Sequence, residues 1–200
     1  PPQHGPIGHF ARADFPGRHI ECLQQVDGGK RERSRQEHQA GRAGVLEQHV
    51  RAVHVGNPVR PEIAGVAPPE RRFAAREGRA RLLVFGGSQG SARLNAVVPA
   101  ALAELPAALR PEVLHQTGSH GFDETRAAYR SRGIEADVRP FIEDMAGAYG
   151  WADLAVCRSG ALTVAELAAA GVGAVLVPFP AAVDDHQTRN AEFAVKAGAA

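Results

Sequence analysis

The sequence predicts an α/β fold in which helices cover both faces of a parallel sheet. Short segments in the second part of the chain are apolar throughout, which is typical of strands buried on both faces. They alternate with helical patterns, an order that indicates parallel strands joined by right-handed crossovers. Apolar residues make up 44% of the chain and aromatic residues only 6%, which favours helices on a sheet over an all-β sandwich. The expected architecture is a doubly wound, Rossmann-like sheet.

Five strands are expected, and a glycine, a proline or a polar turn follows each of them. They should lie at residues 81–85, 112–116, 136–139, 154–157 and 174–178. Helical patterns follow these strands at residues 94–105, 122–132, 145–151, 161–170 and 186–196. Pro106 should close the first helix and Gly171 the fourth, because proline disfavours a helical conformation in the residue before it and glycine readily adopts the left-handed cap. Ligands of such sheets bind beyond the carboxyl ends of the strands.

Residues 1–53 differ from the rest and are expected to be poorly structured. They carry six glutamines and five of the nine histidines, and no helical or strand period persists there. With few large apolar residues to bury, this segment cannot offset its own ordering entropy. Its glutamines and histidines could suggest metal or RNA binding, but they show neither ligand spacing nor interleaved aromatic residues. We therefore expect one ordered domain, at residues 54–200.

Composition argues against several classes of function. A formal net charge of +1 gives no support for nucleic-acid binding, which needs a concentrated basic face, so no nucleic-acid partner is expected. Cys22 and Cys157 lie far apart without a CxxC partner, so neither a disulfide framework nor a zinc site is expected. The chain has no run of about 18 apolar residues, the length that a membrane-spanning helix requires.

A glycine-rich turn, Gly86-Gly87-Ser88-Gln89-Gly90, lies between the first expected strand and the first helix. Its glycines allow a tight turn and a close approach to a ligand, while the following helix start offers unpaired N–H groups. Ser88 adds a hydroxyl donor suited to a phosphate oxygen. A tight turn without a ligand is the alternative. The turn is neither a Walker loop nor a GxGxxG motif.

A second turn of this kind opens the helix at residues 161–170, with Ser159 or Gly160 at the N-cap position. Glu166 lies within the first two turns of that helix. A carboxylate there can accept hydrogen bonds from both cis-hydroxyls of a ribose, while the helix N-terminus faces a diphosphate. The alternative is that Glu166 is a surface acid that complements the helix dipole.

Polar residues also follow the last expected strand and precede the first one. Gln187 and Asn190 are three residues apart and share a helix face, and their amides can both donate to and accept from sugar hydroxyls. Asp184 and Asp185 could suggest a metal pair, but adjacent residues on a helix do not face each other, so no metal is expected. Arg60, in a turn set by Pro58, is a candidate for a phosphate or uracil contact.

Six segments in this order resemble the C-terminal domain of the MurG family. They are GNPVR at residues 56–60, GGSQGS at 86–91, QTG at 116–118, PFIEDM at 140–145, CRSGALTVAE at 157–166 and DHQT at 185–188. The resemblance covers about residues 54–200. It implies the Rossmann-like C-terminal domain of a GT-B glycosyltransferase that moves GlcNAc from UDP-GlcNAc to lipid I, forming lipid II. The family works as a peripheral protein on the cytoplasmic face of the membrane.

The resemblance also implies roles for particular residues. Arg60 and Ser88 would contact the donor, with Ser88 at the diphosphate. Ile142 would bind uracil through its backbone, and Glu166 would hold the ribose. The segment that would line the nucleotide and its phosphates comprises Ala161, Leu162, Thr163, Val164 and Ala165.

For the sugar, the resemblance implies that Gln187 and Asn190 read the GlcNAc hydroxyls. Enzymes of this type need no bound metal and no cofactor, because helix dipoles and hydrogen-bond donors stabilise the departing UDP. The family's N-terminal domain, which holds the lipid I acceptor and supplies the base, has no match here, and the family continues past Ala200. No catalytic base is therefore assigned. The chain is expected to be an incomplete fragment that binds UDP-sugar weakly without turnover.

Three other functions remain open on the sequence. The nearest is a GT-B transferase that uses another UDP-sugar. A Rossmann-type oxidoreductase would need a GxGxxG turn and an acidic residue after the second strand, and neither is present. The third is a non-catalytic, truncated product.

Overall fold

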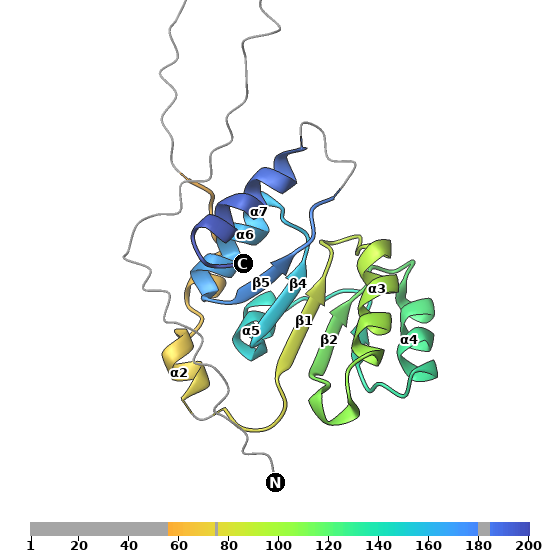
Figure 1. Cartoon of the computed structure of the whole chain (residues 1–200). Coiled ribbons are helices and arrows are strands. Elements are labelled where there is room, and N and C mark those ends of the chain that lie inside the picture. Colours follow the sequence, from red (N-terminus) through yellow and green to blue (C-terminus); the bar gives the residue numbers. More distant parts are fainter. Residues whose placement is uncertain (1–55, 75, 180–184) are drawn as a thin grey trace, which may run out of the picture.

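The computed structural model describes residues 56–74, 76–179 and 185–200 (Figure 1). The segment expected to be poorly structured, residues 1–53, lies outside the described residues. The described part contains a five-stranded sheet in which every strand pairs in parallel with its neighbours. Its strands are β1 (Arg81–Phe85), β2 (Glu112–Gln116), β3 (Asp137–Arg139), β4 (Leu154–Cys157) and β5 (Gly173–Leu176). The predicted parallel sheet is confirmed.

The strands are ordered β3-β2-β1-β4-β5 across the sheet. The chain moves outward from β1 through β2 to β3, returns to β4 on the other side of β1, and continues to β5. Loops that leave β1 and β4 therefore diverge to opposite faces and leave a crevice between them, the point where such sheets bind ligands. Phe85 and Cys157, the last residues of β1 and β4, lie opposite each other in the ladder.

All five predicted helices are present, and two short helices precede the sheet. The helices are α1 (Pro61–Ala64), α2 (Pro69–Phe73), α3 (Ala92–Ala103), α4 (Phe122–Ser131), α5 (Met145–Trp151), α6 (Ala161–Ala170) and α7 (His186–Lys196), with a 3-10 turn η3 (Ala107–Leu109). Both α1 and α2 begin with proline, which is favoured at the first helical position. They are too short to show a helical period, and the sequence predicted a turn at Pro58 but no element at these two helices.

Helices cover both faces of the sheet, as Figure 1 shows. Side chains of β1 alternate between the faces. Leu82 and Val84 pack in the core under α3 and α4, whereas Leu83 and Phe85 pack in the core formed with α1, α5 and α6. A strand buried on both faces has no solvent side on which polar residues could alternate. This explains why the segment RLLVF is apolar after its first residue.

Arg72 of α2 ties the ends of two helices together. Its guanidinium donates to the carbonyls of Tyr149 (3.0 Å) and Ala152 (3.3 Å) at the end of α5. It also donates to Ala170 (2.7 Å) and Gly171 (3.0 Å) at the end of α6. Carbonyls at a helix C-terminus have no partner within the helix and carry its negative dipole end. A planar cation with a fork of donors satisfies both ends at once.

A buried polar chain lies on the other face of the sheet. The ring of His115, which is fully buried, contacts Tyr129 Oη through Nδ1 (2.9 Å) and Asn95 Oδ1 through Nε2 (3.2 Å). Asn95 uses its amide nitrogen to donate to the carbonyl of Thr117 (3.0 Å), so its oxygen faces the ring. We therefore assign the proton to Nε2, which leaves Nδ1 to accept from Tyr129. Burial lowers the pKa of His115 to about 4.

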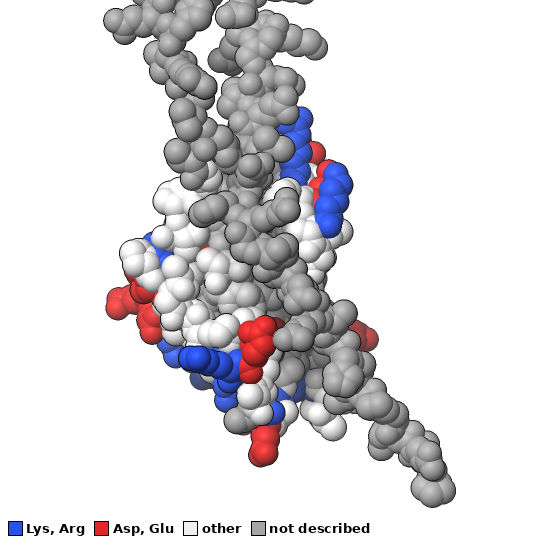
Figure 2. Space-filling model, turned by 90° about the vertical axis from the view of Figure 1, so that its left-hand side faces the viewer, with Lys and Arg blue, Asp and Glu red and all other residues white. Residues whose placement is uncertain are grey.

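Two surface properties bear on function. Among the residues that the structure describes, no helix is both long and apolar enough to cross a membrane. On the face shown in Figure 2, basic and acidic side chains lie next to each other rather than in a patch of one sign.

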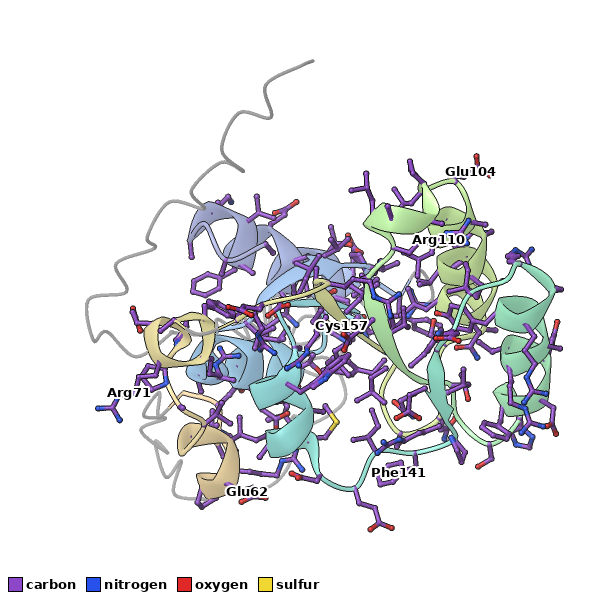
Figure 3. The ribbon with its side chains drawn as sticks, turned by 90° about the horizontal axis from the view of Figure 1, so that it is seen from below. Glu62, Arg71, Glu104, Arg110, Phe141 and Cys157 are labelled. Carbon is purple, nitrogen blue, oxygen red and sulfur yellow. The ribbon has the colours of Figure 1, made fainter. Side chains whose placement is uncertain are left out.

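Replacing Arg72 with methionine should lower the free energy of unfolding by about 3 kcal/mol, because four helix-end carbonyls lose a charged donor. The stability of Arg72→Lys should lie between those of the parent and Arg72→Met, since a lysine ammonium cannot reproduce the forked donors of the arginine. The matched control is Arg71→Met on the same helix, whose side chain points away from the molecule (Figure 3). It should change stability by less than about 0.5 kcal/mol. Urea unfolding measures all three variants, and equal losses at both positions would contradict the assignment.

Protonation of His115 should make the stability of the protein depend on pH. Its pKa falls from 6.5 in the unfolded chain to about 4 in the folded one, so between these values only the unfolded chain takes up the proton. The free energy of unfolding should therefore decrease as the pH drops from 6.5 towards 4, by up to about 3 kcal/mol. Urea unfolding at several pH values should show a smaller decrease for His115→Gln. The exposed His120→Gln should behave like the parent, and parallel curves for all three proteins would refute this.

Candidate functional site

The glycine-rich turn after β1 lies directly against the turn after β2. Gly90 has a positive φ of 75°, and a Cβ added there would overlap the carbonyl of Thr117. Gly118 also has a φ of 75°, and a Cβ on it would overlap the carbonyl of Gln89. The backbones of the two turns thus touch where neither can carry a side chain. This contact holds the turn after β1 in a defined place at the sheet edge.

Gln116, the last residue of β2, also holds the glycine-rich turn after β1 in place. Its side chain is buried, and its Nε2 donates to the carbonyl of Gly87 at 2.9 Å. The same nitrogen lies 3.4 Å from the carbonyl of Pro140, at the turn after β3. Ser88 is left exposed above this support. The sequence marked Gln116 only as part of a motif, and its supporting role depends on burial that spacing alone does not reveal.

Helix α6 begins without a side-chain cap. Gly160 is its N-cap, and the first bond within the helix runs from Val164 N–H to the carbonyl of Gly160 (2.9 Å). The amides of Ala161, Leu162 and Thr163 therefore have no acceptor inside the helix. Helix α3 differs, because the Ser91 hydroxyl accepts from Leu94 N–H at its start. Of the two helices that start beside the β1–β4 crevice, α6 is the one without a side-chain cap, and its first three amides can donate to an anion.

Glu166 lies in the second turn of α6 and meets two hydrogen-bond donors. Arg60 Nε donates to its Oε1 (2.9 Å) and Arg60 Nη2 to its Oε2 (3.3 Å). Tyr149 Oη also donates to Oε2 (3.3 Å). The hydrogen bond with Glu166 raises the pKa of Arg60. Two residues predicted to bind the donor, 106 positions apart in the chain, are thus brought into direct contact, and the sequence did not single out Tyr149.

The start of α7 is anchored to the turn after β4. Ser159 Oγ donates to the carbonyl of Gln187 (2.8 Å), and Asn190 Nδ2 donates to the carbonyl of Ser159 (2.9 Å). Asn190 is buried, whereas Gln187 is half-buried and accepts the N–H of Phe179 through Oε1 (2.9 Å). Ser159 therefore does not cap α6 but positions α7. The two amides predicted to read a sugar both take part in holding the site together.

Arg158 holds the end of β5, a role that the sequence did not assign. Its Nη1 donates to the carbonyls of Val177 (3.1 Å) and Pro178 (2.8 Å). Its guanidinium lies over the ring of Phe179, 5.3 Å from the centroid. The turns after β4 and β5 are therefore joined by side-chain bonds as well as by strand pairing.

The remaining predicted residues differ in what they can offer a ligand. The side chains of Ile142 and Val164 are buried in the core, so only their backbones can reach a ligand. Leu162 is 55% exposed, and Ala161, Thr163 and Ala165 are half-buried. Ser88, Thr163 and Gln187 lie in segments that follow β1, β4 and β5, so all three lie towards the carboxyl edge of the sheet. Convergence on one crevice around a ligand stays a prediction.

Two cavities lie away from the β1–β4 crevice. A cleft of about 310 Å³ opens between α3 and α4 and is lined by Gln89, Asn95 and His120 among others. A smaller apolar pocket lies between α6 and α7, against Leu167 and Phe193. Neither is lined by Arg60, Ser88 or Glu166. Arg60 and Glu166 contact each other, and Ser88 lies exposed on the turn after β1.

This geometry defines a class of protein. A doubly wound sheet with a glycine turn after β1 and an uncapped helix after β4 is a Rossmann-like nucleotide-binding domain, of the kind found in GT-B glycosyltransferases. The chain belongs to glycosyltransferase family 28, whose C-terminal domain matches residues 81–200.

Two similar proteins within this family carry the same name. The chain is 59% identical, over 145 residues, to a protein from Marinobacter nauticus named UDP-N-acetylglucosamine–N-acetylmuramyl-(pentapeptide) pyrophosphoryl-undecaprenol N-acetylglucosamine transferase. A protein of the same name from Azoarcus sp. is 60% identical over 146 residues. These matches take in 72% and 73% of this chain, but it spans only 40% and 41% of the relatives' length.

A solved structure has the same fold. The crystal structure of Acinetobacter baumannii MurG matches with a TM-score of 0.62 and 43% sequence identity. The match covers 67% of this chain and 39% of that one. The resemblance noted from six sequence segments is therefore confirmed at the level of family and fold.

Replacing Gly90 with alanine should be much more damaging than replacing Gly87. Gly87 also has a positive φ, 88°, but a Cβ there meets nothing within 4 Å, so Gly87→Ala should cost only the conformational strain of about 1 kcal/mol. At Gly90 the same strain is joined by overlap with the Thr117 carbonyl, and we expect at least about 2 kcal/mol. Urea unfolding of both variants makes the comparison. Equal losses would show that the two turns do not constrain each other.

Proposed function

We propose that this chain is the donor-binding part of an inverting glycosyltransferase that moves GlcNAc from UDP-GlcNAc to lipid I, forming the lipid II used in peptidoglycan synthesis. The observation that carries the proposal is the position of Glu166, in the second turn of a helix whose open N-terminus lies at the β1–β4 crevice. The names and identities of the relatives support the choice of sugar and acceptor.

The diphosphate is expected at the start of α6. The amides of Ala161, Leu162 and Thr163 point out of the helix end, and the helix dipole favours negative charge there. Ser88, exposed on the neighbouring turn, adds a hydroxyl donor from the opposite side of the crevice. Two independent elements would thus grip the two phosphates.

The nucleoside is expected on the α5 side of the sheet. A carboxylate is an acceptor-only group and matches the two donors of a ribose cis-diol, which assigns the ribose to Glu166. The backbone of Ile142, whose side chain is anchored in the same core as Tyr149, is assigned to uracil. Arg60 lies close enough to Glu166 to reach the donor as well.

The GlcNAc group is expected near the start of α7. The Oε1 of Gln187 is held by Phe179 N–H, which turns its NH2 group towards other acceptors, such as a sugar hydroxyl. Asn190 donates to the carbonyl of Ser159 and so supports this end of α7. A direct contact between Asn190 and the sugar stays a prediction.

The described residues would act on the leaving group. In an inverting transfer the acceptor hydroxyl oxygen forms a bond to the anomeric carbon as the bond to the UDP oxygen breaks, and the acceptor proton passes to a base. Negative charge then develops on the β-phosphate of UDP. Amides at the α6 N-terminus, fixed before the reaction begins, stabilise that charge. We assign no base within this chain.

The acceptor places the reaction at a membrane. The relatives' names include undecaprenol, a lipid alcohol that stays in the bilayer. We therefore propose that the parent protein works peripherally at the cytoplasmic face of the membrane and reaches lipid I through a part outside this domain.

Calorimetric titration of the chain with UDP-GlcNAc, UDP-GalNAc and UDP-glucose tests the proposal. UDP-GlcNAc should bind best, and Glu166→Gln should weaken it about tenfold, the effect of weakening hydrogen bonds to a charged group. Glu70→Gln, an exposed change on α2, is the control and should bind like the parent. Preference for another UDP-sugar would redirect the proposal to a different GT-B transferase. Absence of binding at millimolar donor, or full binding by Glu166→Gln, would reject it.

A further inference from the structure

The carboxylate of Glu166 is held by two donors of opposite character. The side chain of Tyr149 is fully buried and comes from α5. Arg60 directly precedes α1, and its side chain is 46% exposed. One donor is part of the core, whereas the other lies on the surface. They therefore differ in how readily each can move when a ligand arrives.

Tyr149 is fixed by its surroundings. Its ring packs edge-on against Phe85, with centroids 6.0 Å apart and planes at 75°. It belongs to the core cluster that includes Leu83 and Ile142. Burial, followed by the charge of Glu166, raises the pKa of Tyr149 above its ordinary value of 10, so the hydroxyl stays protonated and remains a donor. Its bond to Glu166 Oε2 is thus available at every physiological pH.

The capacity of the carboxylate decides which donor yields. An ionised carboxylate has about four lone-pair positions. Tyr149 uses one of them and Arg60 uses two, and a ribose diol needs two more. All five bonds cannot form together. The buried tyrosine cannot withdraw without disrupting the core, so the exposed arginine is the donor that gives way.

We propose that Tyr149 is a positioning residue that orients Glu166 to accept a ribose cis-diol, and that Arg60 occupies the diol's place while the site is empty. The inference rests on the proposed function. Once Arg60 releases at least one of its bonds, its guanidinium becomes available to the bound nucleotide. Arg60 can therefore contact Glu166 in the empty site and the sugar nucleotide in the occupied one, as expected from the sequence.

The test compares the affinities of UDP and 2′-deoxy-UDP, which lacks one hydroxyl of the diol, for the full 200-residue chain by calorimetry. The parent should bind UDP about tenfold more tightly than 2′-deoxy-UDP, the value of one hydrogen bond to a charged group. In Tyr149→Phe this ratio should fall to about threefold or less, because UDP, which has both hydroxyls, loses more affinity than 2′-deoxy-UDP, which has one. Arg60→Gln removes the competitor, so its ratio should not fall.

Tyr129→Phe is the matched control. Tyr129 is equally buried but bonds to His115 on the other face of the sheet, so its variant should keep the parent's ratio. Circular dichroism confirms that both variants, each lacking one oxygen atom, are folded. The Glu166→Gln variant should bind UDP and 2′-deoxy-UDP with nearly equal affinity. If it does, three results would overturn the inference and leave the proposed function standing: an unchanged affinity ratio in Tyr149→Phe, equal weakening of both ligands in that variant, or a lower ratio in Arg60→Gln. If the parent binds neither ligand, the proposed function fails as well.

Discussion

The pairing of β1 with β4 is the constraint on which the rest of the site depends. Parallel strands present their carboxyl ends at one edge, and this pairing brings together two turns that lie about seventy residues apart in the chain. The turn after β1 is then held by backbone contact with the turn after β2. The turn after β4 is held by Ser159 and Arg158, which bind α7 and the end of β5. Each turn is fixed from its outer side, so the inner sides face each other across the crevice.

Helix α6 is satisfied at one end and open at the other, and this asymmetry follows from the surrounding elements. Its C-terminal carbonyls receive Arg72 and its last residue is followed by Gly171 in the left-handed conformation. Its N-terminus has a glycine cap, and the one serine beside it points to Gln187 instead. The negative end of the helix dipole is therefore neutralised inside the protein. The positive end has no side-chain cap, as the proposed diphosphate contact requires.

Much of the fold could be predicted from the sequence because the strands are apolar runs with clear stops, and those patterns reflect burial on both faces. The sequence also singled out candidate site residues next to the strand ends, such as Ser88 in the turn after β1 and Glu166 in the helix after β4. It could not reveal Tyr149, which reads as one more apolar position of a helix until its hydroxyl is found against Glu166. The packing of Asn190 under Ser159 was hidden for the same reason. A side-chain amide looks alike in a sequence whether it faces solvent or supports a neighbouring loop.

The contacts of Glu166 show how one site can be both ordered and open. A carboxylate without partners at a sheet edge would change rotamer freely and lose the orientation that a diol needs. A carboxylate held only by buried donors would have no capacity left for a ligand. One buried hydroxyl and one exposed guanidinium divide these tasks: Tyr149 restricts the orientation, and Arg60 satisfies the remaining charge with bonds that can be exchanged. Because the proposed exchange replaces hydrogen bonds with hydrogen bonds, the proposed ribose contact requires no unsatisfied charge in either state.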